Sequence, residues 1–317
     1  MTHENKIKYL YPFSAPMSIE AYLKRINSRI VFPFWHVVSD AELPHISCLY
    51  KVQTSNEFKT SLEVLLQHFV PISVEDVLSQ ENLNPNKNYM CLSFDDGLVQ
   101  MHDIVAPILK SRGIPAAFFI NPPFVGDAQY FFRYERSALL YHLLESQNLS
   151  KSKQNEILDS DNSENPGAIW ENYGVNRKEI MEKQRIYMNC DEVKSLHNSG
   201  FHIGAHSMTH ANFACISADE KNQEVKQSVD WVSENIQTKI RSFAFPFSDD
   251  GLSQSEIKQI YKTADLTISF GTSGHGKMKE LSHYQRIPME HTRVYPTQKI
   301  LKSELFAAWL KQKLKSQ

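Results

Sequence analysis

Residues 91–97 read CLSFDDG, a stretch that places two adjacent carboxylates, Asp95 and Asp96, directly after an apolar run. The apolar residues 89–92 predict a buried strand, and Gly97 permits a sharp turn after the acids. Two like charges side by side repel each other. The pair is therefore either a solvated turn in which one Asp caps the next helix, or a site where one carboxylate binds a metal ion and the other handles protons.

Apolar runs of this kind alternate along the chain with stretches of helical period. The predicted strands are Ile30–Val38, Tyr89–Phe94, Ala116–Asn121, Phe201–Ala205, Ser242–Phe245 and Leu266–Ser269. The predicted helices include Ile104–Ser111, Asp191–Ser199, Ala218–Ile236 and one that begins at Ser73, with Asp76 three residues on. Alternation of strands and helices indicates an α/β fold with a mainly parallel sheet, open or closed into a barrel.

Two segments depart from this alternation. Residues 127–188 combine the aromatic stretch QYFFRYE with a polar, turn-rich stretch at 148–166, and we predict an inserted helical region with an exposed loop. Residues 298–317 have apolar side chains at near-helical spacing and predict a C-terminal helix docked onto the rest. We expect residues 1–317 to form a single domain.

The composition excludes some classes of protein. Lys and Arg (34) nearly balance Asp and Glu (36), so no concentrated positive charge favours a nucleic acid partner. No apolar run is long enough to span a bilayer, and the first residues lack the pattern of a signal peptide. Four widely separated cysteines predict reduced thiols. We expect the cytoplasm, or the periphery of the inner membrane face, as the location, and the oligomeric state stays open.

The second informative stretch is FHIGAHSMTH, residues 201–210, where a predicted strand ends in two histidines four residues apart. Such a pair is either structural or able to bind one metal ion. Because the carboxyl ends of parallel strands share one face, we expect His206 and His210 to lie near Asp95 and Asp96. Two histidines and one aspartate leave open positions on a metal, as in catalytic sites that hydrolyse amides or esters.

SFDDG followed by HSMTH resembles the motifs of the polysaccharide deacetylases, carbohydrate esterase family 4, which carry the NodB homology domain. Residues 105–109, 113–119 and 241–247 are similar to the family's next helix, next strand and third motif, so the resemblance covers about 30–125 and 186–290. It implies a distorted (β/α) barrel with about seven strands. It also implies a hydrolase of carbon–nitrogen, non-peptide bonds that removes acetyl groups from N-acetylated, sometimes O-acetylated, sugars.

The resemblance also implies roles for individual residues. Asp95 is the general base, and Asp96, His206 and His210 bind a divalent metal, usually zinc, with cobalt, nickel and manganese as alternatives. The backbone N–H of Phe247 stabilises the oxyanion. The substrate groove contains Phe245, Pro246 and Arg286.

The general acid is less readily placed. The text nearest to the family's late histidine segment, SHYQRIPMEH at 282–291, offers His283 and His291. Either histidine protonates the leaving amine, or metal-bound water does so, or the leaving group needs little help, as in an ester.

Other residues have structural and functional interpretations. We expect His36 to be structural or groove-lining, His102 to lie on a helix surface, and Trp170 and Trp231 to be packing residues. Residues 130–133 of the insertion either reach over the site or pack elsewhere. The favoured substrate is an acetylated precursor of a surface polysaccharide. The alternatives are a hydrolase of a non-sugar amide and a non-catalytic glycan-binding protein.

Overall fold

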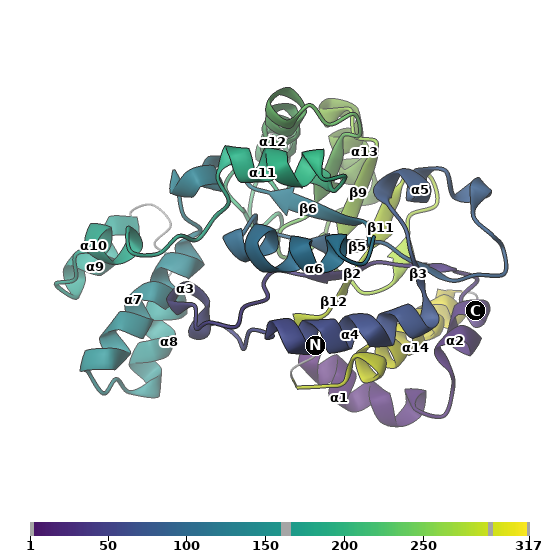
Figure 1. Cartoon of the computed structure of the whole chain (residues 1–317), viewed down its shortest axis with the longest axis horizontal. Coiled ribbons are helices and arrows are strands. Elements are labelled where there is room, and N and C mark those ends of the chain that lie inside the picture. Colours follow the sequence, from purple (N-terminus) through teal and green to yellow (C-terminus); the bar gives the residue numbers. More distant parts are fainter. Residues whose placement is uncertain (1–2, 160–165, 291–293, 316–317) are drawn as a thin grey trace.

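A barrel of parallel strands forms the centre of the molecule, seen in a computed structural model that describes residues 3–159, 166–290 and 294–315 (Figure 1). In spatial order its strands are β2 (Pro33–Trp35), β5 (Leu92–Phe94), β6 (Ala116–Ile120), β7 (His202–Ala205), β8 (Ser242–Ala244), β9 (Ile268–Gly271), β11 (His283–Gln285) and β12 (Ile287–Pro288). Each strand from β2 to β11 pairs in parallel with the next one in this order, and β12 pairs in parallel with β2. β11 and β12 do not pair with each other but follow one another along the chain.

The last strand closes the barrel by changing partners. β11 pairs with β9, with Tyr284 opposite Phe270, whereas β12 pairs with β2, with Pro288 opposite Phe34. Only Arg286 separates β11 from β12. The barrel is therefore continuous but distorted at this point.

Two further strands are also interrupted by a single residue. β1 (Ile30–Val31) precedes β2, and β4 (Tyr89–Met90) precedes β5; with β3 (Val70–Pro71) they form a small parallel sheet in the order β1-β4-β3. Counting β1/β2, β4/β5 and β11/β12 as one strand each, the described residues form the expected distorted barrel of about seven strands. β10 (Gly276–Lys277) adds an antiparallel edge to β11.

Helices cover the outside of the barrel (Figure 1). They are α4 (Ser55–His68), α5 (Val74–Leu78), α6 (Ala106–Lys110), α11 (Cys190–Asn198), α12 (Ala218–Ile236) and α13 (Gln254–Ala264), with the short turns η1 (Gln80–Asn82), η2 (Met101–Val105) and η3 (Pro122–Asp127). Each of the helices α4, α5, α11, α12 and α13 begins with a capping box. The start of each helix is therefore fixed by residues only three positions apart in the sequence. The predicted cap at Ser73 is confirmed, since its side chain accepts from the Asp76 backbone N–H.

The predicted insertion contains α7 (Phe132–Ser146), α8 (Lys151–Asp159), α9 (Pro166–Asn172) and α10 (Arg177–Met181), which project from one end of the barrel (Figure 1). The short helix α3 (Pro44–Ser47) packs against α7. An ion pair between Arg177 and Glu135 connects α10 to α7. Trp170 on α9 is buried, as expected of a packing residue.

The first and last helices lie on one side of the barrel, where α1 (His3–Ser14), α2 (Ile19–Arg25) and α14 (Thr297–Lys315) pack together (Figure 1). Ile300, Leu301 and Leu305 of α14 are fully buried, so this helix docks as expected. Among the described residues, no helix has the length and apolarity needed to cross a membrane.

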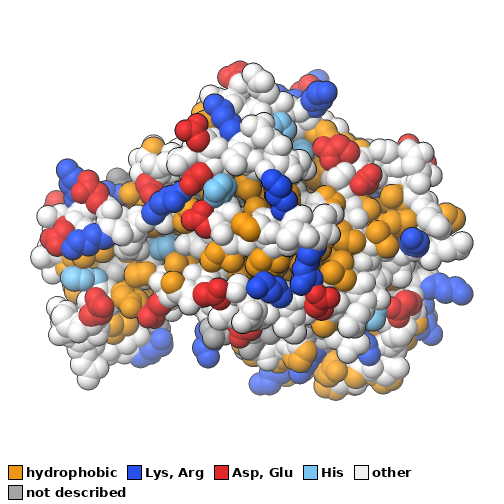
Figure 2. Space-filling model, viewed as in Figure 1, with side chains coloured by type: hydrophobic (Ala, Val, Ile, Leu, Met, Phe, Trp, Pro, Cys, Tyr) orange, Lys and Arg blue, Asp and Glu red, His pale blue; other side chains and the backbone are white. Residues whose placement is uncertain are grey.

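Some boundaries differ from the predictions. The strand expected at Ile30–Val38 ends at Trp35, and the helix expected from Ile104 begins with the π-helical turn η2. The strands β11 and β12 were not predicted, because they have only three and two residues. On the face shown in Figure 2, acidic and basic side chains are interspersed, and hydrophobic side chains gather between α6 and α4.

Candidate active site

Three potential metal ligands converge at the carboxyl ends of two barrel strands. Asp96 follows β5, and His206 and His210 follow β7. The Asp96 Oδ1 atom lies 3.3 Å from His206 Nε2 and 3.1 Å from His210 Nε2. All three side chains are buried.

Neighbouring groups orient two of these ligands. His206 Nδ1–H donates to the Ala244 carbonyl at 2.8 Å, which leaves its Nε2 lone pair directed at Asp96. Tyr134 donates its hydroxyl to Asp96 Oδ2 at 2.5 Å, so Oδ1 remains available. Asp96 Oδ1 and His206 Nε2 are buried and have no hydrogen-bond partner among the described residues. One carboxylate oxygen and two imidazole nitrogens that converge in this way, two of them without a hydrogen-bond partner, fit a divalent cation such as zinc.

The charge states also suit metal binding. Burial would raise the pKa of Asp96, but His210 and His206 outweigh it and hold the pKa well below the usual range. Burial lowers the pKa of His210 despite the opposing charge of Asp96. An ionised carboxylate beside a neutral imidazole is the form in which both groups bind a metal.

Asp95 has a different partner from its neighbour. The Arg286 guanidinium donates from Nη1 to Asp95 Oδ1 and from Nη2 to Oδ2, both at 2.7 Å. Burial raises the pKa of Asp95, but the charges of Arg286 and His206 lower it by more than burial raises it. The net pKa therefore lies below the usual value. The two adjacent carboxylates are tolerated because each faces its own positive or polar partners.

The turns that carry the site adopt left-handed backbone conformations. Asp96 and Ser207 have φ of 70°, His210 has 55° and Phe247 has 54°. Such values are uncommon for residues other than glycine and are typical of functional sites. Gly97 follows with φ of 68°, and a Cβ there would lie 3.2 Å from Ile120 Cγ2. The sharp turn after the acids therefore requires glycine.

A groove of about 240 Å³ opens onto Asp95, Asp96 and the two histidines. The insertion contributes Phe131, Arg133 and Tyr134 to its lining. The Phe131 ring centre lies 4.2 Å from that of His210. The insertion thus forms one wall of the groove, which was one of the two interpretations of its aromatic stretch.

Phe245 and Phe247 both line this groove, as expected for the third motif. Pro246 between them is buried and is not part of the lining. Thr272 Oγ1 donates to the Phe247 carbonyl at 2.8 Å and fixes this turn. The Phe247 backbone N–H has no acceptor among the described residues, so it remains available to a substrate oxygen.

The prediction that Arg286 lines the groove is wrong. Its side chain is fully buried beneath Asp95, and its guanidinium carbon lies 4.3 Å from the centre of the Phe34 ring. Arg286 also donates to Ser93 Oγ and to the Gly271 carbonyl. Four of its five N–H donors are used inside the barrel, and the side chain is shielded from the groove.

His283 is placed away from the groove, contrary to a role as general acid. Its Nδ1 contacts Ser269 Oγ at 2.8 Å and its Nε2 contacts Asp249 Oδ2 at 3.0 Å. The Phe245 ring packs against it, with 5.7 Å between the ring centres. Both ring nitrogens are therefore engaged and shielded. His291, the other candidate, lies outside the described residues.

A different histidine faces the groove. His36 follows β2 and lines the groove beside Asp95 and Asp96. Glu290 Oε1 lies 2.6 Å from His36 Nδ1 and also accepts from the His36 backbone N–H at 2.8 Å. Burial lowers the pKa of His36, but Glu290 and Asp96 outweigh it and raise the pKa to about 10. Its position at a strand end, like that of Asp95, was the available sequence signal.

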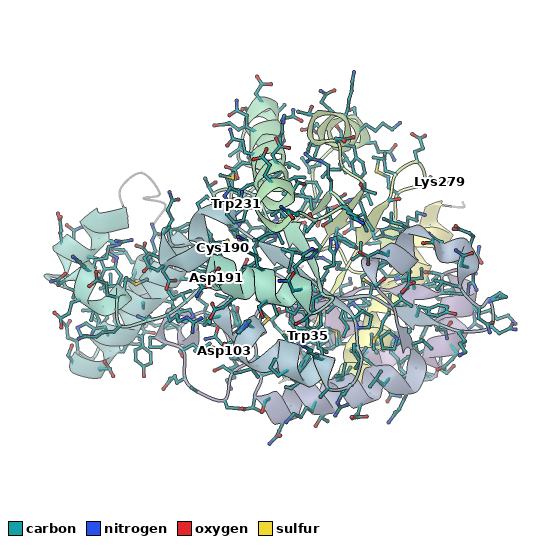
Figure 3. The ribbon with its side chains drawn as sticks, turned by 45° about the horizontal axis from the view of Figure 1, so that its top comes forward. Trp35, Asp103, Cys190, Asp191, Trp231 and Lys279 are labelled. Atoms are coloured by element: carbon teal, nitrogen blue, oxygen red, sulfur yellow. The ribbon has the colours of Figure 1, made fainter. Side chains whose placement is uncertain are left out.

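A second group of potential metal ligands lies outside the barrel. His102, Asp103 and Glu192 come together where η2 meets α11, and Figure 3 labels Asp103 near Cys190 and Asp191. Arg185 forms ion pairs with both Asp103 and Glu192. Because this arginine already neutralises the carboxylates, the buried Asp96 site is the stronger candidate. His102 is on the helix surface, as expected.

Paired acids and histidines at the carboxyl ends of barrel strands are typical of a hydrolase. The model of the polysaccharide deacetylase family matches residues 82–269, more than half of the chain. The chain therefore belongs to the polysaccharide deacetylase family and is a hydrolase of carbon–nitrogen bonds other than peptide bonds. The matched segment includes Asp95, Asp96 and both histidines, but neither His36 nor Arg286.

Solved structures of deacetylases share the fold. The Streptococcus pyogenes deacetylase PplD in complex with acetate has a TM-score of 0.57 and 15% identity, over 87% of this chain and 97% of that chain. IcaB from Ammonifex degensii has a TM-score of 0.56 and 15% identity, over 86% of this chain and 97% of that chain. A de-N-acetylase from Aggregatibacter actinomycetemcomitans has a TM-score of 0.51 and 17% identity, over 81% of this chain and 93% of that chain. Comparison with curated protein sequences gives no match.

Proposed function

We propose that this chain removes the acetyl group from an N-acetylated sugar in a surface polysaccharide precursor, using a divalent metal ion. The observation that carries the proposal is the separation of roles between Asp95 and Asp96. Arg286 binds one carboxylate, and the imidazoles of His206 and His210 face the other. A hydrolytic site needs both a proton acceptor and a metal ligand within one groove.

Asp96, His206 and His210 would hold the metal. One oxygen and two nitrogen ligands favour zinc over magnesium or calcium, and cobalt, nickel or manganese would also suit these donors. When bound, the ion supplies Lewis acidity toward the acetyl oxygen and toward a water molecule.

Asp95 is the proposed general base. Its pKa is lowered, chiefly by Arg286 acting against burial, so it is ionised at neutral pH. The two bonds from Arg286 fix the plane of the carboxylate. Each carboxylate oxygen has a second lone pair, which can accept a proton from the attacking water. Arg286 is then a positioning residue for this base.

We propose His36 as the general acid, in place of His283. The elevated pKa keeps the imidazole protonated at neutral pH, and Nδ1 is held by Glu290. Nε2 is then the nitrogen free to give a proton to the leaving amine. The Phe247 backbone N–H is the proposed donor to the oxyanion.

The groove is suited to a sugar that carries an acetyl group. Its lining combines aromatic side chains, including Phe131 and Phe247 with 6.0 Å between their ring centres, with the polar groups of the active site. A de-N-acetylase is among the proteins that share the fold, which supports an N-acetyl bond ahead of an O-acetyl bond.

The test is acetate release by zinc-loaded and metal-free protein on N- and O-acetylated sugars, chitooligosaccharides and a non-sugar acetamide. Metal-dependent release from an N-acetylated sugar is the expected result. Release only from the acetamide would instead identify a hydrolase of non-sugar amides. Saturable binding of a chitooligosaccharide with no release from any substrate would identify a glycan-binding protein.

A further inference from the structure

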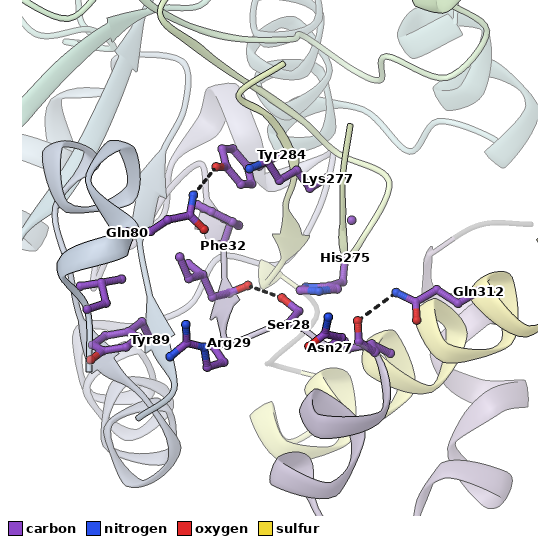
Figure 4. Close-up of a pocket in the computed structure, with 14 residues that line it drawn as sticks. Asn27, Ser28, Arg29, Phe32, Gln80, Tyr89, His275, Lys277, Tyr284 and Gln312 are labelled. Carbon is purple, nitrogen blue, oxygen red and sulfur yellow. Dashed lines mark hydrogen bonds between the residues drawn. The ribbon is translucent and has the colours of Figure 1, made fainter. Parts of the chain in front are cut away.

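The change of strand partners at Arg286 leaves a seam at the amino ends of the barrel strands. On one side of the seam β1 pairs with β4, and on the other β11 pairs with β9. No strand pairing joins β1 to β11 within residues 3–159, 166–290 and 294–315. A pocket of about 450 Å³ lies here, bordered by β1, β4 and the β10–β11 hairpin (Figure 4).

This seam pocket is separate from the catalytic groove. Residues that line it, such as Ile30 and Tyr89, stand at the start of strands whose other ends lead to His36 and Asp95. The two pockets have no lining residue in common. About five residues of extended chain, or roughly 16 Å, separate the ends of each strand. A ligand in the seam pocket would therefore leave the catalytic groove open.

The lining of the seam pocket is positively charged. Its polar side chains include Asn27, Arg29, Gln80, His275, Lys277 and Gln312, and none of the described residues that line it is Asp or Glu. The volume is within the range of about 300–1,000 Å³ that is typical of small-molecule sites. An uncompensated positive lining favours an anionic ligand.

Both cations are positioned without a carboxylate partner. The Lys277 ammonium lies 5.0 Å from the centre of the Tyr284 ring. Arg29 Nη1 donates to the Asn84 carbonyl at 3.3 Å, which leaves most of the five guanidinium N–H donors free. Neither side chain forms an ion pair with a carboxylate in the described part of the chain. An arginine and a lysine held in this way match the charge of a phosphate monoester, about −1.5 to −2 at neutral pH.

His275 supplies an independent indication of a ligand. Its Nδ1 atom is shielded from solvent and has no hydrogen-bond partner in the described structure. Burial lowers the pKa of His275 to about 4 against the opposing effect of Glu304, so the ring is neutral at pH 7. Figure 4 shows the imidazole pointing into the pocket beside Ser28. A shielded polar atom without a partner needs one from outside the protein.

Two amides at the pocket are fixed in place. Gln80 Nε2 donates to the Tyr284 hydroxyl at 3.1 Å, and Gln312 Nε2 donates to the Ile26 carbonyl at 3.0 Å (Figure 4). The amide oxygens of Gln80 and Gln312 accept no hydrogen bond from the described residues. Fixed amide oxygens are suitable acceptors for sugar hydroxyls.

We propose that the seam pocket binds a phosphorylated sugar, with Arg29 and Lys277 supplying the positive charge for its phosphate and His275, Gln80 and Gln312 the hydrogen-bond partners for its hydroxyls. Neither cation is part of the catalytic groove. The site is thus a second carbohydrate site on the opposite end of the barrel from the deacetylase groove.

The test is isothermal titration calorimetry at fixed ionic strength with glucose 6-phosphate, glucose and inorganic phosphate. We expect saturable binding of glucose 6-phosphate, and binding of glucose and of inorganic phosphate at least about tenfold weaker, because each lacks one set of contacts. Arg29→Gln and Lys277→Gln should each weaken the binding of glucose 6-phosphate about fivefold to tenfold. Both side chains are exposed, so the variants should fold.

Lys279→Gln is the matched control, because this exposed lysine is two residues from Lys277 and does not line the pocket. It should bind glucose 6-phosphate like the wild type. Absence of saturable binding of glucose 6-phosphate to the wild type would overturn the proposal. So would an affinity for glucose 6-phosphate in the Arg29→Gln and Lys277→Gln variants equal to that of the wild type. Equal affinity for inorganic phosphate and glucose 6-phosphate would overturn the assignment to a sugar.

Discussion

Arg286 binds both carboxylate oxygens of Asp95, at 2.7 Å each, from the single residue at which the last barrel strand changes partners. The side chain that orients the proposed base therefore lies at the point where the barrel closes. Both groups are buried, with Arg286 fully shielded from solvent. A buried ion pair of this geometry is strongly affected by loss of one partner.

Arg286→Met should destabilise the protein at pH 7 by about 3–5 kcal/mol, because it leaves the Asp95 charge buried without a partner. In the wild type the pKa of Asp95 is lowered, so the pair contributes stability above the unfolded pKa and loses it as pH falls. In the variant only His206 and His36 oppose the effect of burial, so the pKa of Asp95 should rise, and protonation at lower pH should reduce the cost of the unpaired charge. Urea unfolding at pH 7 and pH 5 should show the difference between the proteins narrowing at pH 5.

Arg112→Met is the control for Arg286→Met, since Arg112 forms an exposed ion pair with Glu63. It should change the free energy of unfolding by no more than about 1 kcal/mol. If Arg286→Met were equally mild at pH 7, the carboxylate of Asp95 would not depend on Arg286.

Asp95→Asn should retain metal and lose acetate release by about 10²–10⁴-fold in kcat, because the amide cannot accept the proton of the attacking water. Metal content by atomic absorption and acetate release measured on the same preparation separate the two properties. Full activity of this variant would remove Asp95 from the role of base. Loss of metal would instead make it a ligand.

His206→Ala and His210→Ala should each lose bound zinc, since each removes one of three ligands. His102→Ala is the matched control: it removes a histidine from the surface cluster, where Arg185 already pairs with the carboxylates. We expect this control to keep wild-type metal content after dialysis. Wild-type zinc in both ligand variants would exclude the Asp96 site as the metal centre.

Tyr134→Phe should weaken zinc affinity by about 10–100-fold, because the Tyr134 hydroxyl holds Asp96 Oδ2 and so orients Oδ1. The measurement is competition with a chelator of known affinity. Tyr141→Phe, on the same helix but bonded to exposed Glu42, is the control and should be unchanged. Equal affinities of the two variants would mean that the insertion covers the metal site without supporting it.

The metal ligands could be predicted from the sequence because each follows an apolar run at a strand end. That pattern is local, and parallel topology then brings the ends of β5 and β7 to one face. The capping boxes, such as Ser73 with Asp76, are local in the same sense. In both cases a few neighbouring residues carry the information.

The partners of Arg286 and His36 could not be predicted in this way, although His36 also stands at a strand end. Arg286 meets Asp95 across 191 positions of sequence, and His36 meets Glu290 across 254. Both contacts depend on the last strand pairing first with β9, through β11, and then with β2, through β12. These two short strands have no clear apolar pattern in the sequence. The functional partner of each residue is therefore set by barrel closure.

His36→Gln should lower kcat for an N-acetylated sugar by about 10²–10⁴-fold and have a much smaller effect on an aryl acetate ester. The amine leaving group must be protonated, whereas a phenolate leaves without help. Glu290 raises the pKa of His36, so Glu290→Gln should lower that pKa. The protonated acid is then lost at lower pH, and the alkaline limb of the pH–kcat profile should move toward neutral pH.

His283→Gln decides between the two histidines, because His283 is held by Asp249 and Ser269 behind Phe245 and does not line the groove. Any loss of activity in this variant should be the same for the amide and for the ester, since it would come from altered packing. If the amide-selective loss appeared in His283→Gln and not in His36→Gln, the acid would be His283, and the groove would have to open behind Phe245 during the reaction.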